Sequence, residues 1–169
     1  ALHGIVIMPG VKGVKIISSR NQYYKGTIQN FTGYGIYAEG TNEYPIEKLF
    51  IDNISSNHNY SGIYIKYGFN SIISNCETDS NCNWNNVYGI YIKNGSQALI
   101  TKCSANANKS TNNVYGIFLE NVINTTVEHS TAHINQSLEL GSTYGFYITA
   151  SNGSTSSSNK INSSPAYEN

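Results

Sequence analysis

The sequence predicts an all-β protein built as a parallel β-helix, a solenoid in which coils of short strands stack on one another. Three observations lead to this prediction. The composition favours short strands and turns, one motif recurs at a spacing close to 27 residues, and apolar and polar residues alternate within each copy of the motif. Alternation with a period of two is typical of strands that bury one face, and a fixed period of about 20–50 residues is typical of repeat architectures.

The composition favours strands over helices. The chain has 169 residues, including 24 asparagines, 21 serines, 21 isoleucines, 14 tyrosines and only three prolines. Isoleucine and tyrosine favour strands, while asparagine and glycine tolerate the positive φ angles of tight turns. We therefore expect one domain of short strands joined by turns.

The charge balance argues against two classes of partner. Ten basic and ten acidic residues cancel, so no overall charge would attract nucleic acid or anionic lipid. The apolar stretch at residues 5–8 is far shorter than the roughly 20 residues needed to cross a bilayer. We expect neither a nucleic-acid partner nor a membrane span.

The first strand of each repeat is a Gly-Ile-Tyr-Ile motif or a near relative of it. Successive copies are 31, 27, 27, 27 and 29 residues apart, and they begin at Gly4, Gly35, Gly62, Gly89, Gly116 and Gly145. Because side chains alternate along a strand, the residue after each glycine and the residue two places later point inward.

A second strand follows the first, in the form Ile-x-Asn-Cys or a relative of it. Its copies begin at Ile51, Ile73, Ile100 and Val127, with a related stretch at residues 28–31 one coil earlier. Each copy leads in phase to an asparagine: Asn59, Asn81, Asn108 and Asn135. The second copy follows the first by 22 residues because residues 41–45 lengthen one turn and the loop before Gly62 is short.

A unit of two or three short strands cannot bury its inner face alone, but stacked units at the spacing of about 4.8 Å bury it continuously. The spacing of a leucine-rich repeat and the 3.6-residue period of helical repeats are both missing. We expect three inward columns: Ile36, Ile63, Ile90, Ile117 and Phe146; Ala38, Ile65, Ile92, Leu119 and Ile148; and Ile51, Ile73, Ile100 and Val127.

On these strands and the recurrent asparagine, residues 4–150 resemble the right-handed parallel β-helix proteins of the pectin-lyase-like superfamily. The resemblance implies a right-handed solenoid of about five or six coils over residues 1–150, followed by a Ser/Asn-rich segment, residues 151–169, that forms a cap or an extended tail. It also implies that the four asparagines form a ladder of hydrogen-bonded amides. The superfamily includes lyases, hydrolases, epimerases and non-catalytic surface proteins, so the fold does not name an activity.

The three cysteines are predicted to be unpaired. Cys76 and Cys103 occupy equivalent inward places on adjacent coils, where in-register side chains rarely offer the torsion of about 90° that a disulfide needs. Cys82 lies in an Asn-rich loop without a counterpart one coil later. The cysteines therefore do not form a disulfide scaffold.

The candidate ligand-binding residues form one outward row: Tyr37, Tyr64, Tyr91, Phe118 and Tyr147. An exposed row of rings could bind sugars or a protein partner. The alternative is that the row only stabilises the stacked strands through neighbour contacts. The direction of four corner tyrosines is ambiguous: Tyr34, Tyr88, Tyr115 and Tyr144. An exposed charged column of ion pairs is expected next to the row: Glu39, Lys66, Lys93 and Glu120.

No catalytic, metal or cofactor site is predicted. The resemblance implies acidic calcium ligands and an arginine for a lyase, or clustered aspartates with a histidine for a polygalacturonase, but the aspartates Asp52 and Asp79 fall in different columns and Arg20 is the single arginine. No pattern singles out Glu77 or Glu128. His129 and His133 sit on a strand and a turn, where their spacing does not form a metal site.

We therefore expect a non-catalytic β-helix, extracellular or on a cell surface, that contacts a polysaccharide, a surface glycan or a protein. The alternative is a polysaccharide lyase or glycoside hydrolase with its site in loops or at a subunit junction. The strand at residues 4–7 lies close to the start without a capping element, so we also expect a longer parent chain or head-to-tail assembly of copies into a filament.

Overall fold

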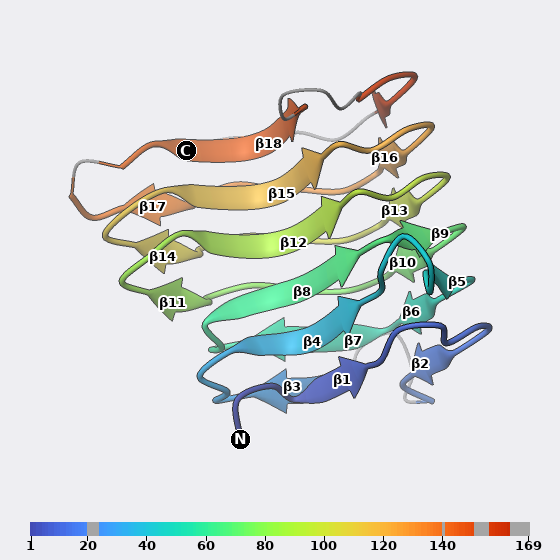
Figure 1. Ribbon diagram of the computed structural model, residues 1–169. Coiled ribbons are helices and arrows are strands. Elements are labelled where there is room, and N and C mark those ends of the chain that lie inside the picture. The colour runs from blue at the N-terminus through green and yellow to red at the C-terminus, as the bar shows by residue number, and fades with distance from the viewer. Residues whose placement is uncertain (20–23, 140, 151–155, 163–169) are drawn as a thin grey trace.

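The computed structural model describes residues 1–19, 24–139, 141–150 and 156–162. These residues form 19 strands and no helix, and they wind into a stack of coils (Figure 1). None of the described segments has the helical length and apolarity needed to span a bilayer. The prediction of an all-β parallel solenoid is confirmed.

Sheet 1 carries the Gly-Ile-Tyr-Ile motifs. Its six parallel strands follow the order β1 (Ile5–Ile7), β4 (Tyr34–Glu39), β8 (Ser61–Lys66), β12 (Val87–Lys93), β15 (Val114–Glu120) and β18 (Thr143–Thr149). The register pairs equivalent repeat positions, so Ile63 lies between Ile36 and Ile90. The register therefore places each repeat position in a column along the solenoid.

Sheet 2 carries the second motif in six parallel strands: β2 (Lys15–Ile17), β6 (Phe50–Asp52), β10 (Ile72–Ser74), β13 (Leu99–Thr101), β16 (Thr126–Glu128) and β19 (Lys160–Asn162). A corner sheet contains β11 (Cys82–Asn83), β14 (Lys109–Ser110) and β17 (Gln136–Ser137). Two further pairs complete the described strands: β3 (Gly26–Gln29) with β7 (Ile54–Asn57), and β5 (Ile46–Glu47) with β9 (Gly68–Phe69).

Strand β19 extends sheet 2 beyond residue 150, because it pairs with β16. The other residues of the predicted C-terminal segment, 151–155 and 163–169, lie outside the described residues. Whether that segment is a cap or a tail stays a prediction.

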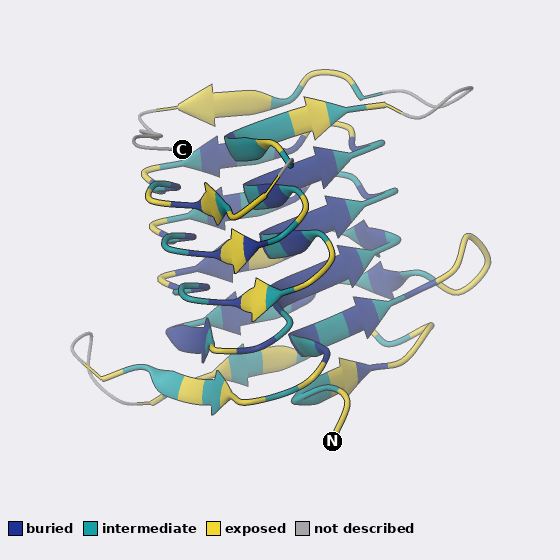
Figure 2. Ribbon diagram, turned by 90° about the vertical axis from the view of Figure 1, so that its left-hand side faces the viewer, coloured by how far each residue is buried: buried dark blue, intermediate teal, exposed yellow. Residues whose placement is uncertain are grey.

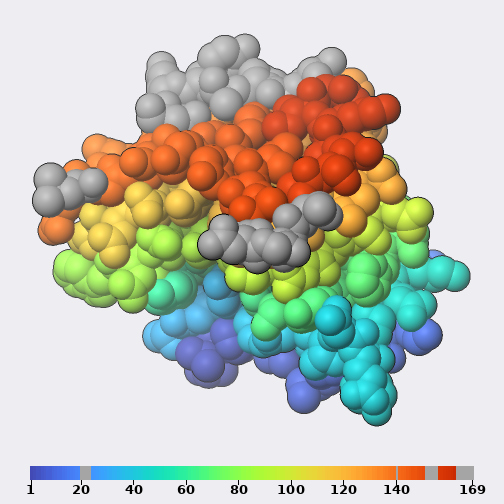
Figure 3. Space-filling model, turned by 45° about the horizontal axis from the view of Figure 1, so that its top comes forward, coloured from blue at the N-terminus to red at the C-terminus, as the bar shows by residue number. Residues whose placement is uncertain are grey.

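The three inward columns form one apolar core along the inside of the solenoid (Figure 2). The last coil differs from the prediction: Phe146 is only partly buried and Ile148 is 37% exposed. Both lie on β18, which pairs with β15 on one side and has no described strand on the other. Figure 3 looks onto this end, where the last coil is orange.

The repeat glycines have a different role from the one that composition suggested. Positive φ angles belong mostly to other residues, for example Asn53, Asn75 and Asn94, whereas the only described glycines with positive φ are Gly10 and Gly13. A Cβ atom on repeat glycine Gly89 would lie 2.5 Å from the carbonyl oxygen of the glycine one coil later. The repeat glycines are therefore needed because neighbouring coils approach closely.

The asparagine ladder is confirmed. The backbone N–H and side-chain Nδ2 of Asn81 both donate to Oδ1 of Asn108, at 3.1 and 3.0 Å, and Asn108 repeats both bonds to Asn135. Asn59 begins the ladder by donating its backbone N–H to Oδ1 of Asn81 at 3.0 Å. All four side chains are buried, so each amide satisfies donors that would otherwise be unpaired.

The cysteine predictions are confirmed with one correction. Cys76 and Cys103 are buried free thiols on adjacent coils, and Cys82 is exposed and free. Cys82 does have a counterpart, however, because it begins strand β11 and pairs with Lys109. The Asn-rich sequence around Cys82 obscured this short strand.

The corner sheet begins part-way along the solenoid. Asn59 precedes its repeat glycine Gly62 by three residues, whereas Asn81 precedes Gly89 by eight. The longer connection contains β11, and the shorter one leaves no room for an equivalent strand. As a result, β11 pairs with β14 on one side and has no described strand on the other.

Candidate functional site

The predicted aromatic row lies on the outer face of sheet 1 and is joined there by the corner tyrosines. Rings from both columns pack together into what we call the aromatic stack: Tyr34, Tyr37, Tyr64, Tyr88, Tyr91, Tyr115, Phe118, Tyr144 and Tyr147. The structure thus settles the direction of the corner tyrosines, which turn towards the row.

Many rings in the aromatic stack lie face to face along the solenoid, while others are tilted, such as Tyr64 and Tyr91 at 58°. The Tyr91 and Phe118 centroids are 4.7 Å apart with an interplanar angle of 25°, and those of Tyr88 and Tyr115 are 5.2 Å apart at 10°. The side chains in the middle of the row are only 7–9% exposed: Tyr64, Tyr91 and Phe118. The row is therefore not the open, flat strip that its outward direction suggested, because its ring faces cover one another. This packing favours the stabilising alternative, and ligand binding by the row stays a prediction.

The charged column next to the stack forms the predicted ion pairs, but its side chains are only partly exposed and not fully exposed as expected. Lys66 Nζ lies 2.6 Å from Glu39 Oε1, and Lys93 Nζ lies 3.0 Å from Glu120 Oε1. Two hydroxyls of the stack join these pairs, since Tyr37 donates to Glu39 and Tyr91 donates to Glu120. Burial raises the pKa of Tyr91, so its hydroxyl remains a neutral donor at ordinary pH.

A histidine that sequence analysis did not single out ends the stack at the first coil. Valine replaces the aromatic residue there, because Val6 pairs with Tyr37. The His3 ring covers the exposed face of Tyr37, with centroids 4.4 Å apart and an interplanar angle of 11°, and its Nδ1 accepts the backbone N–H of Tyr34 at 3.0 Å. Burial lowers the pKa of His3.

A hollow of about 470 Å³, which we call the stack hollow, opens beside this end of the stack. Its lining combines Tyr37, the Glu39–Lys66 ion pair, Met8 and Tyr67 with part of the inserted turn at residues 41–45. The connection between β4 and β5 loops out of the coil at this place (Figure 1). The inserted turn and the missing aromatic at Val6 were both visible in the sequence, but their proximity required the structure.

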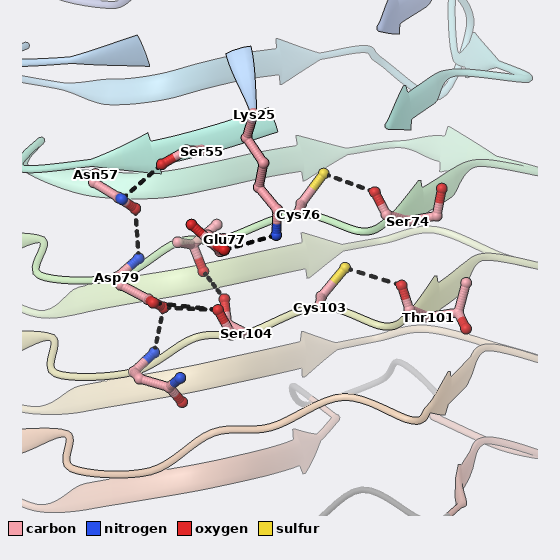
Figure 4. Close-up of polar contacts among 12 residues, drawn as sticks. Lys25, Ser55, Asn57, Ser74, Cys76, Glu77, Asp79, Thr101, Cys103 and Ser104 are labelled. Atoms are coloured by element: carbon pink, nitrogen blue, oxygen red, sulfur yellow. Dashed lines mark hydrogen bonds and ion pairs between the residues drawn. The ribbon is translucent and has the colours of Figure 1, made fainter. Parts of the chain in front are cut away.

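The carboxylates of Glu77 and Asp79, on the side of the coil opposite sheet 1, bond to neighbouring residues (Figure 4). Asp79 accepts hydrogen bonds from the Ser104 hydroxyl at 3.1 Å and the Asn106 backbone N–H at 2.8 Å, while Glu77 pairs with Lys25 at 2.8 Å. Burial raises the pKa of Asp79, and the neighbouring Glu77 charge adds to the effect.

The remaining charged candidates do not come together. Asp52 lies in another column, where it accepts the Ser74 hydroxyl at 2.6 Å. Within the described ranges, no three His, Cys, Asp or Glu side chains cluster as metal ligands would. Arg20 lies outside the described residues.

Comparison with known proteins identifies the fold family. Residues 12–167 match the family model described as the right-handed beta helix region. The chain belongs to this right-handed β-helix family. The A-module of mannuronan C-5 epimerase AlgE6 from Azotobacter vinelandii has a similar fold, with a TM-score of 0.63 and 14% sequence identity.

The β-helix spans about half of that epimerase module, because the match covers 96% of this chain and 48% of the module. The A-module of AlgE4 from the same organism gives a TM-score of 0.24 at 11% identity, over 83% of this chain and 62% of that module. No curated protein sequence matches the chain. The family match and the fold shared with the AlgE6 module confirm the recognition of a right-handed parallel β-helix.

Proposed function

We propose that the protein is a non-catalytic, extracellular β-helix that binds a polysaccharide along the outer face of sheet 1. The observation that carries this proposal is the stack hollow, where Tyr67 lies next to the Glu39–Lys66 ion pair, with Lys66 Nζ 5.7 Å from the centre of its ring. A sugar ring has an apolar face that packs on aromatic rings and hydroxyls that bond to charged groups. The hollow therefore suits one sugar unit of a longer chain.

Two further features support a polysaccharide ligand. The aromatic stack continues from the hollow along the sheet, so tyrosine edges and ion pairs extend in one line beyond the first sugar. The epimerase module of similar fold is named for mannuronan, a polysaccharide. We take mannuronan oligomers as the first ligands to test for this reason.

A second candidate function is a polysaccharide lyase or glycoside hydrolase at the same hollow. It is favoured by the Tyr37 hydroxyl, the Glu39 carboxylate and the Lys66 ammonium group, which lie in contact and could transfer protons. Both candidates bind a glycan, but only the second releases a new product. Chromatography of oligomannuronate and neutral hexasaccharides after incubation would separate them.

The binding test needs a variant that keeps the fold. Replacing Tyr64 and Tyr91 by serine would remove two buried rings, so it could not separate binding from stability. Tyr67 is better, because its register partners in the next two coils are Asn94 and Asn121, and all three residues have a positive φ. Tyr67→Asn thus introduces the residue that the next two coils have at the equivalent position.

We expect Tyr67→Asn to weaken oligosaccharide binding about tenfold in calorimetry while the melting temperature stays unchanged. Tyr24→Asn, at an exposed tyrosine outside the hollow, is the control and should bind as the natural protein does. Equal affinity of Tyr67→Asn and the natural protein would exclude the stack hollow as the binding site.

A further inference from the structure

A second hollow, of about 520 Å³, lies at the free edge of β11. It lies where the coil before β11 has the short connection after Asn59, so no described strand takes the place of a corner strand there. We call it the corner hollow and define it by Phe31, His58, Tyr60, Cys82, Asn83 and Trp84. It shares no lining residue with the stack hollow.

Trp84 is the only tryptophan of the chain, and its side chain is 81% exposed at the corner hollow. Its exposure does not come from a loose backbone. The next coil holds the backbone here, because Thr111 donates its hydroxyl to the Trp84 carbonyl and Ser110 donates its hydroxyl to the Asn85 carbonyl. The backbone that carries this ring is therefore held in place, at the border of the corner hollow.

The register shows how unusual this ring is among the repeats. The residue after each corner strand is Trp84 in the first, Thr111 in the second and Leu138 in the third. Only the first of these corner strands borders the hollow. Among these three equivalent positions, the aromatic residue therefore occurs in the coil that borders the hollow, where a ligand could lie against its ring.

The polar lining of the corner hollow has an unmet hydrogen-bonding group. The Nδ2 atom of Asn83 is buried and has no hydrogen-bond partner among the described residues. A buried donor without a partner is costly. Asn83 and Trp84, which follow each other in the sequence, both line the hollow.

The other residues that line the corner hollow indicate whether its ligand is charged. Other polar groups come from the side chains of Asn30, Thr32 and Ser80, and no Asp, Glu, Lys or Arg occurs among the described residues that line the hollow. Amides, hydroxyls and aromatic rings without a fixed charge suit an uncharged ligand with hydroxyls around an apolar face. Pockets of about 300–1,000 Å³ hold small-molecule ligands, and this hollow falls in that range.

We propose that the corner hollow is a binding site for a neutral oligosaccharide, with one pyranose ring on Trp84 and sugar hydroxyls bonded to the polar groups of the lining. The site lies apart from the polysaccharide face of sheet 1, and it does not depend on the function proposed there. A protein with both sites would hold two glycan segments at once.

The chain supplies two intrinsic probes for the test. The fluorescence of the single tryptophan reports directly on Trp84, and iodoacetamide should alkylate Cys82 selectively because Cys76 and Cys103 are buried. The ligands are four neutral β-1,4-linked hexasaccharides of glucose, N-acetylglucosamine, xylose and mannose, with hexamannuronate as the charged comparison. We expect at least one neutral hexasaccharide to shift Trp84 emission to shorter wavelength and to slow Cys82 alkylation about fivefold.

Matched variants test the two key residues. Trp84→Thr and Asn83→Ser introduce the residues found at the same positions one coil later, Thr111 and Ser110, so both variants should fold. We expect calorimetry to show about tenfold weaker binding for Trp84→Thr and a smaller loss for Asn83→Ser, at an unchanged melting temperature.

The two proposals fail separately. Tyr67→Asn should leave the Trp84 and Cys82 responses unchanged, because Tyr67 lines only the stack hollow. The corner site is excluded if no neutral hexasaccharide changes either probe, if hexamannuronate alone does so, or if Trp84→Thr keeps the natural affinity.

Discussion

At the scale of single residues, glycine and asparagine hold fixed places in each coil for different physical reasons. The repeat glycines leave room for the carbonyl of the next coil, while many asparagines adopt the positive φ of the bends and four others form the buried ladder. Sequence analysis predicted the ladder, because the asparagines recur in phase. It placed the repeat glycines at the start of the first strands but gave no reason for them there, since a pattern of letters does not show how closely two backbones approach.

Gly89→Ala should therefore destabilise the protein. The new Cβ would lie 2.5 Å from the carbonyl oxygen of Gly116 and 2.7 Å from the Cβ of Ala105, and neither atom belongs to a flexible side-chain end. We expect urea unfolding to show a loss of about 1–3 kcal/mol. Asn85→Ala, an exposed change in the same coil, is the control and should have little effect. Equal stability of the two variants would contradict the role given to the glycine.

Asn108→Ala should destabilise the protein more than an alanine at an outward asparagine. The change removes the acceptor of both the backbone N–H and the Nδ2 of Asn81, and each buried donor left unpaired costs about 1–3 kcal/mol. Asn106→Ala is the matched control, since its Oδ1 accepts only the His133 backbone N–H, on the outer face. Chemical denaturation of both variants checks the difference, and a larger loss for Asn106→Ala would refute it.

At the scale of elements, the aromatic stack shows what a repeat pattern predicts and what it does not. Alternation along the strand correctly placed the row on the outer face of sheet 1. The burial of its rings depends on the neighbouring corner column. That column changes along the solenoid: most coils have a tyrosine there, but the first coil has His3 and another has Ser61. Packing between columns is a property of side-chain size and direction, which the period of the repeat does not contain.

The aromatic stack makes stability sensitive to alkaline pH. Burial raises the pKa of Tyr34, Tyr64 and Tyr91 above the ordinary value of 10.0. The unfolded chain therefore loses these protons first, so the stabilisation is complete below about pH 10 and is lost as pH rises through the folded-state values. We expect tyrosinate absorbance to rise and near-ultraviolet circular dichroism to disappear in one cooperative step. Gradual ionisation with the dichroism retained would show that the rings are accessible.

At the scale of the whole molecule, the sequence predicted the solenoid well because every coil repeats the same burial pattern. The two hollows were not predicted, because each arises where one coil departs from its neighbours. Residues 41–45 are inserted at the stack hollow, and five residues fewer separate the ladder asparagine from the repeat glycine at the corner hollow. A search for repeats detects what the coils share. It therefore does not detect the two hollows, which lie where one coil differs from the others.

End-to-end association stays a prediction that the strand edges allow us to test. Among the described residues no strand covers the outer edges of β1 and β18, and Val6 on β1 is 50% exposed. We expect light scattering to show association that increases with concentration, and Val6→Lys to reduce it by placing a charge at the edge. A particle of one chain's mass, 18.5 kDa, at every concentration would exclude self-assembly.

The face-to-face rings of sheet 1 have an optical consequence. Tyrosine chromophores held 4.5–5.3 Å apart in a fixed geometry, as Tyr88 and Tyr91 or Tyr37 and Tyr64 are, couple their electronic transitions. The resulting near-ultraviolet signal belongs to the stacked coils and not to any single ring, while the emission of Trp84 arises at the corner of the solenoid. Two spectroscopic measurements on the unlabelled protein can therefore follow the integrity of the coil stack and the occupancy of the corner independently.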